Sequence, residues 1–216
     1  MEALRLTFRL ATAMVDPGHP VHLDAVLAFA AVQAAGGDLA AAERLPLERH
    51  EPQAAPWCWK ASRIVPHVVL RDVLPVTRAF EPWAWAEDRD VRYAGGPRVL
   101  TGGTGPYKSY QLRFGMIQAD VAIAYALGER AGIEALLAGI HHLGKLARLG
   151  CGEIVSVRVE PDEAARECWA YRTLPDQRPG YRAALATVRP PYWRRGDRTR
   201  AWEPAEPPAE LMRALQ

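Results

Sequence analysis

Two segments of the chain alternate apolar and polar residues, as strands with one buried face do. In the first, the apolar residues are Leu4, Leu6, Phe8 and Leu10, separated by Arg5, Thr7 and Arg9. In the second, over residues 153–160, Val155, Val157 and Val159 alternate with Ser156, Arg158 and Glu160. The pattern predicts a strand near each end of the first 160 residues.

Two other segments have the spacing of amphipathic helices. Residues 22–35 place Leu23, Val26, Leu27, Ala30 and Ala34 on one face, and Gly36 and Gly37 follow them. From residue 133 onward, the apolar residues are Ile133, Leu136, Leu137, Ile140, Leu143 and Ala147. The spacing predicts one helix over 22–35 and a second that continues to about Ala147.

Two further strands, over 57–62 and 121–127, complete the order β-α-β-β-α-β. This order predicts an α+β fold with a ferredoxin-like βαββαβ core, in which two helices lie on one face of a four-stranded antiparallel sheet. Residues 64–115 are rich in proline and glycine, fit no core pattern and are expected to form a long β-hairpin insertion. We therefore expect one domain over 1–160 and a C-terminal extension over 161–216.

The segment between the second predicted helix and the last strand combines glycines with positive charges. Gly144, Gly150 and Gly152 permit positive φ and close approach of a ligand to the backbone, and free amides in such a turn bind anions. On a helix, His141, Lys145 and Arg148 would form a positive ridge leading into these glycines. The plainer alternative is a helix C-cap with basic residues that complement the helix dipole.

The composition indicates which ligands the protein suits and in which cellular compartment it works. The net charge is only +2, although 24 of the 27 basic residues are arginines, a side chain suited to phosphates and bases. Cys58, Cys151 and Cys168 are widely spaced and odd in number, which indicates a reducing cytoplasm without a disulfide framework. The sequence contains no apolar run of the length that a membrane span requires.

Three further groups of residues suit a polynucleotide. Lys108, Tyr110 and Arg113 are expected to share one face of a strand, and Lys60 lies in the aromatic strand 57–62. Residues 189–202 combine five arginines, Arg194 and Arg195 among them, with three aromatic residues and a single acid. A solvated, weakly ordered tail is the plainer interpretation of this last segment.

The sequence contains residues that could suggest three kinds of catalytic site. Residues 102–109 resemble a P-loop, but Tyr107 replaces the glycine that precedes the lysine, so a nucleotide triphosphatase is disfavoured. His141 and His142 are adjacent and the other histidines are scattered, so no metal site or cofactor is expected. Metal-independent RNA cleavage by His141, His142, Tyr107 or Tyr110 is chemically open, but no spacing specifies it.

Several stretches resemble the RAMP superfamily of CRISPR-associated proteins, and in particular the small, Cas-five-like RAMP subunit of type IV systems. These stretches are 4–15, 19–33, 57–62, 101–110, 141–160 and 188–195. The most specific is the glycine-rich turn HLGKLARLGCG over 142–152. The resemblance covers most of the chain and is weaker over residues 38–56 and 203–216.

The resemblance implies a subunit of an RNA-guided effector complex that targets nucleic acid through its guide RNA. Such a subunit caps a filament of backbone RAMP subunits, holds the 5′ handle of the CRISPR RNA and contacts the large subunit. Gly144, Lys145, Arg148, Gly150 and Gly152 would then hold handle phosphates, and the hairpin would be the thumb that folds over the guide. Lys108 and Tyr110 would touch RNA or the neighbouring backbone subunit.

We expect no catalysis, because a separate RAMP nuclease generally processes the precursor RNA in type IV systems. Two alternatives stand beside this hypothesis. One is a metal-independent endoribonuclease on the same fold, and the other is a purely structural adaptor that binds only protein neighbours.

Overall fold

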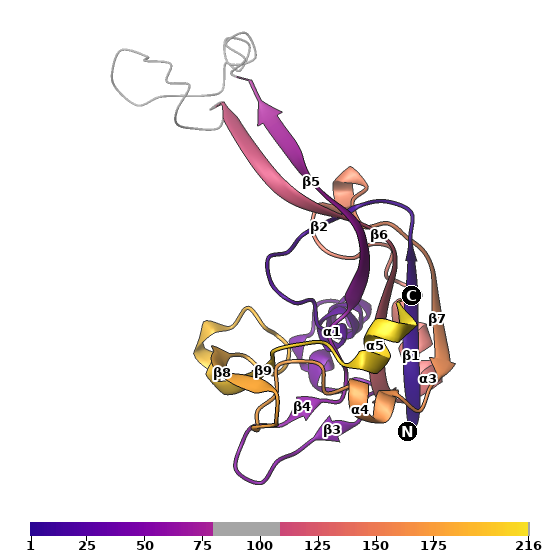
Figure 1. Ribbon diagram of the computed structural model, residues 1–216, viewed down its shortest axis with the longest axis vertical. Helices are drawn as coiled ribbons and strands as arrows, with labels where there is room; N and C mark the ends of the chain where they lie inside the picture. The colour runs from indigo at the N-terminus through magenta and orange to yellow at the C-terminus, as the bar shows by residue number, and fades with distance from the viewer. Residues whose placement is uncertain (80–108, 216) are drawn as a thin grey trace.

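The computed structural model describes residues 1–79 and 109–215, apart from the side chain of Arg195 (Figure 1). Its centre is an antiparallel sheet. β1 (Glu2–Leu10) lies between β6 (Tyr110–Gly128) and β7 (Ile154–Pro161), and β5 (Val65–Arg78) pairs with the other edge of β6. The short β2 (Met14–Val15) also pairs with β6, at Met116 and Ile117. The predicted α+β class with an antiparallel sheet is confirmed.

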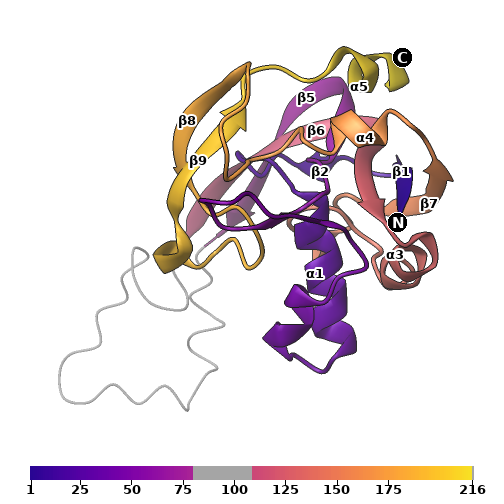
Figure 2. The same cartoon turned by 90° about the horizontal axis from the view of Figure 1, so that it is seen from below.

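Both faces of the sheet are covered by other elements, and β6 therefore has apolar residues at successive positions. Ala122, Ala124 and Ala126 pack into one core cluster, whereas Ile123 and Tyr125 pack into a second. Figure 2 shows α1 and α3 on one side of the sheet and α4 and α5 on the other. A strand buried on both sides carries apolar residues at successive positions instead of alternating with polar ones.

The first helix agrees with its prediction and the second does not. α1 spans Leu23–Ala34, close to the predicted 22–35. α3 spans only Arg130–Leu137, so the predicted helix to Ala147 is wrong. After Gly139 the chain becomes extended, and the amide of Ile154 bonds the carbonyl of His141 at 2.8 Å.

The apolar spacing beyond residue 137 misled the prediction because two different elements fill the same core. Ile140 and Leu143 are buried, as the helical pattern requires, but they enter the core from an extended segment. Burial alone therefore does not distinguish a continuing helix from a strand that follows it.

The predicted strand over 57–62 is much shorter in the structure. β4 (Cys58–Trp59) pairs with β3 (Arg49–His50), and a 3₁₀ helix, η1 (Leu39–Glu43), precedes them. The second half of the predicted strand meets β6 only through an isolated bridge between Ala61 and Ala126 among the described residues. The main-sheet position next to β6 belongs to β5, which begins at Val65 and runs outward into the hairpin (Figure 1). The predicted insertion thus shares its strands with the core sheet.

The C-terminal residues pack onto the sheet, so a weakly ordered tail is the wrong interpretation. They form α4 (Ala165–Cys168), β8 (Tyr181–Ala186), η3 (Arg195–Asp197), β9 (Thr199–Pro204) and α5 (Ala209–Ala214). Trp169, Leu174 and Leu211 are buried against the face of β6 that carries Tyr125.

A buried arginine joins this extension to the rest of the fold. Arg172 is fully buried and donates to the carbonyls of Trp59 at 2.6 Å, Ala61 at 3.0 Å and Val188 at 2.6 Å. It also donates to the Tyr192 hydroxyl at 2.6 Å. One side chain therefore connects the segment before β5, α4 and the 188–192 segment.

Three observations concern disulfides, membrane spans and metal sites. Cys58, Cys151 and Cys168 are free and buried. In the described ranges, no helix has the length and hydropathy to span a membrane. Over the same residues, His, Cys, Asp and Glu side chains nowhere gather in threes as a metal ion would need.

Candidate nucleic-acid interface

The glycine loop, residues 144–152, is held in place by the two strands that flank it and by the β1–β2 connection. Its base is closed by the His142–Glu153 bridge and by the Leu143 amide, which bonds the Gly152 carbonyl at 2.8 Å. The Thr12 hydroxyl donates to the Gly150 carbonyl at 2.6 Å and accepts from the Glu153 amide at 2.9 Å. The loop is therefore fixed at both ends.

The three glycines of the loop have the positive φ that this residue type permits. The angles are +85° at Gly144, +76° at Gly150 and +69° at Gly152. At Gly152 a Cβ atom would overlap the Leu143 carbonyl, so this position needs glycine for space as well as for conformation. Leu146 also has a positive φ, +61°, an uncommon and strained conformation for a leucine.

A run of backbone amides in this loop has no hydrogen-bond acceptor among the described residues. Within the described chain, the N–H groups of residues 144–148 donate to no acceptor, whereas those of Leu149, Gly150 and Cys151 bond within the loop. The glycines are not the C-cap of α3, which ends at Leu137. Successive unpaired amides present partial positive charge and suit an anion.

Formal charge adds to these amides. Lys145 and Arg148 are exposed, and neither forms an ion pair with a described residue. They do not form the predicted helical ridge with His141, because residues 138–146 are not helical. The cations and the amides instead share one short loop, an arrangement suited to a phosphate.

A groove runs beside the loop. It has a volume of about 460 Å³ and lies between α1 and residues 139–147, with Ala25, Val26, Phe29, His141 and His142 among its lining. His141 is exposed and His142 half-buried. The structure thus places both predicted histidines beside the glycines, on an extended segment rather than on a helix.

The chain matches a known protein family over most of its length. The family model described as CRISPR type IV associated protein Csf3 matches residues 2–204. The chain belongs to the Csf3 family. The predicted resemblance to a type IV CRISPR-associated protein is confirmed, and no curated protein matches the chain.

The hairpin of this Csf3 family member separates two residues that the sequence analysis put together. β5 and β6 pair without interruption from Arg78↔Tyr110 to Pro75↔Arg113. Because faces alternate along a strand, residues three apart lie on opposite faces. Tyr110 and Arg113 therefore do not share a face, and Lys108 lies outside the described residues.

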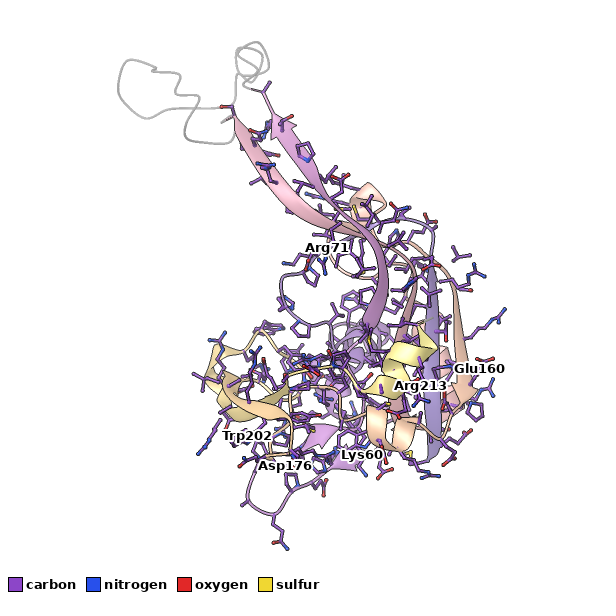
Figure 3. The ribbon with its side chains drawn as sticks, viewed as in Figure 1. Lys60, Arg71, Glu160, Asp176, Trp202 and Arg213 are labelled. Atoms are coloured by element: carbon purple, nitrogen blue, oxygen red, sulfur yellow. The ribbon has the colours of Figure 1, made fainter. Side chains whose placement is uncertain are left out.

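The remaining predicted residues lie elsewhere on the Csf3 family fold. Lys60 bonds Glu48, and its ammonium lies 5.8 Å from the centre of the Trp169 ring, at the end of the molecule opposite the hairpin (Figure 3). The exposed Arg194 lies 5.7 Å from the Trp193 ring, and Arg195 begins η3. Lys60 thus has a structural partner, whereas Arg194 faces solvent.

Two features of the interface were missed at the sequence level. Thr12 fixes the glycine loop through two hydrogen bonds, although it follows β1 with no motif to mark it. Arg71 forms a 2.7 Å ion pair with Asp16 and ties the hairpin stem to the β2–α1 connection (Figure 3). Both contacts join segments far apart in sequence, so no local pattern signals them.

Proposed function

We propose that this Csf3 family chain is a non-catalytic RNA-binding subunit of a type IV CRISPR effector complex and holds the 5′ handle of the CRISPR RNA. The observation that carries the proposal is the glycine loop, with its run of unpaired amides over 144–148 and two exposed cations. The family's type IV CRISPR association supports an RNA ligand.

The mechanism follows from the chemistry of the loop. Phosphate oxygens of the handle accept from the amides of residues 144–148, while Lys145 and Arg148 neutralise charge and release counterions. Gly144 and Gly150, which lack side chains, allow the RNA backbone to approach. Such contacts recognise the position and shape of phosphates rather than base sequence.

In this proposal the sheet is a ferredoxin-like RAMP core and the hairpin is its thumb. The strand order β7–β1–β6–β5, antiparallel throughout, supports the core assignment, as does the position of α1 and α3 on one face. The length of β5 and of β6 supports the thumb assignment.

The chain caps one end of the backbone filament and contacts the neighbouring backbone subunit and the large subunit. The two faces of the hairpin support contacts of two kinds. According to the strand register, Leu74, Val76 and Phe114 lie on one face, between Asp72 and Arg78, and Arg113 lies on the other. Arg71 is also on this second face but is paired with Asp16. The apolar stretch suits a protein neighbour, and the exposed Arg113 suits RNA.

The test is fluorescence anisotropy of the purified chain with a labelled repeat 5′ handle and with a scrambled RNA of equal length, in EDTA. Gel analysis of the same samples detects cleavage. The proposal predicts handle-preferring binding without a cut product. A defined product would favour an endoribonuclease, and the absence of RNA binding by both the chain and its assembled complex would favour an adaptor.

A further inference from the structure

An exposed aromatic residue stands at the centre of the outer face of α1. Phe29 is 58% exposed, although it lies on a helix packed into the core. Three open grooves meet at this side chain. One lies against Pro190–Trp193, one against the end of α3, and the third is the groove beside the glycine loop. Phe29 therefore connects the glycine loop to the 190–193 segment across α1.

A second exposed aromatic residue marks the far end of this surface. Trp193 is 70% exposed and lines the same groove as Phe29, a hollow of about 270 Å³. Its neighbour Tyr192 turns inward, where its hydroxyl bonds the Asp24 carboxylate at 2.9 Å and its ring stacks on His22. Because Tyr192 is anchored, Trp193 is held at the rim of the groove.

Charge distinguishes the ligand classes that such a surface could bind. Arg194 lies beside Trp193, and Lys145 and Arg148 lie at the other end, in the glycine loop. Exposed aromatic rings between cations match single-stranded nucleic acid, whose bases stack while its phosphates pair with the cations. An apolar protein segment would fill the grooves but would leave the cations at both ends without partners.

We propose that Phe29 and Trp193 form a base-stacking platform for single-stranded RNA that continues from the glycine loop across α1. This inference rests on the proposed function, because the loop fixes the RNA backbone that delivers bases to the platform. Stacking tolerates any base, so the platform adds affinity and direction to the bound strand without reading its sequence.

The test compares a labelled repeat-handle RNA with the same RNA carrying abasic nucleotides, which keeps the phosphates and removes the bases. The proteins are the wild type, the Phe29→Ala/Trp193→Ala variant and a control with two other exposed apolar residues changed, Val155→Ala/Leu185→Ala. Circular dichroism checks the fold of each variant. A third variant, Lys145→Ala/Arg148→Ala, tests the glycine loop separately.

The platform predicts that Phe29→Ala/Trp193→Ala binds the handle about tenfold or more weakly, with an unchanged salt dependence. It also predicts that abasic RNA binds this variant and the wild type equally. Equal affinity of the variant and the wild type for the handle would overturn the platform, as would tight wild-type binding of abasic RNA. A different result would contradict the role of the glycine loop in RNA binding. In that case Lys145→Ala/Arg148→Ala would bind the handle with the affinity and salt dependence of the wild type.

Discussion

The guanidinium of Arg172 lies 3.0 Å from the carboxylate of Asp24, and both side chains are fully buried. Asp24 belongs to α1 and Arg172 follows α4, so the pair joins the layers on opposite sides of the sheet. Burial alone would lower the pKa of Arg172, but the Asp24 carboxylate, together with Tyr192 and Cys58, outweighs burial and raises that pKa. The arginine is therefore charged in the folded protein.

Removing this arginine should destabilise the whole fold. Arg172→Leu leaves the Asp24 carboxylate buried without its counter-ion and removes the arginine hydrogen bonds to the carbonyls of Trp59, Ala61 and Val188. The expected loss is about 3–5 kcal/mol in the free energy of unfolding. Urea unfolding measures it, with the exposed Arg182→Leu on β8 as control. Equal stability of the two variants would contradict the anchoring role.

His22 should make stability depend on pH. Burial and the nearby Arg172 and Arg63 charges hold the pKa of His22 well below 6.5, so the folded state keeps this ring neutral. The unfolded chain gains the proton as pH falls below about 6.5, so stability is lost in that direction. The loss from this group is at most about 1.4 kcal/mol per pH unit.

The pH effect can be assigned with one substitution. The Nδ1 atom of His22 is buried without a partner among the described residues, and its ring stacks on Tyr192. Phenylalanine would keep the stacking and remove the titration. We expect urea unfolding of His22→Phe to change less between pH 7.5 and pH 5.5 than the wild type or the exposed His19→Gln. An identical pH dependence in all three proteins would refute the assignment.

The glycines of the loop should differ in what they tolerate. At Gly150 a Cβ would meet open space, so Gly150→Ala costs only the conformational penalty of positive φ, about 1–2 kcal/mol. At Gly152 the added carbon would also overlap the Leu143 carbonyl and force the base of the loop apart. Gly152→Ala should therefore lower both stability and RNA affinity more than Gly150→Ala does. Thermal unfolding and anisotropy check this order, and a reversed order would be inconsistent with the loop geometry.

On the hairpin, Arg113 should contribute to RNA binding through charge. It is exposed on the face opposite Tyr110. Arg113→Ala should reduce the slope of log affinity against log salt by about one unit. Gln111→Ala changes a neutral residue on the same face and should leave the slope unchanged. A slope that Arg113→Ala does not alter would remove this face from the interface.

Local sequence patterns were sufficient to predict the elements that bury a single face. Alternation located β1 and helical spacing located α1, because each has one clearly apolar face. Residue type alone also marked the loop glycines as positions where a positive φ is permitted, and the structure has it there. The separation of Tyr110 from Arg113 was accessible too, since an odd spacing on a strand changes the face.

The rest depended on contacts between distant segments. The end of α3 was overestimated because Ile140 and Leu143 reach the same core from an extended segment. The packing of residues 161–215 depends on an apolar cluster and on Arg172, whose partners are up to 148 residues away, at Asp24. The unpaired amides of the glycine loop could not be predicted either, because they depend on backbone geometry and the pattern of side chains does not determine it.

The salt dependence of handle binding by Lys145→Ala/Arg148→Ala tests the central claim most directly. Arg166→Ala/Arg213→Ala is the matched control, because it removes two exposed cations from α4 and α5, across the sheet from α1. We predict that the loop variant binds more weakly and loses about two units of slope while the control keeps both. Wild-type affinity and slope in the loop variant would contradict the claim that the glycine loop holds the RNA.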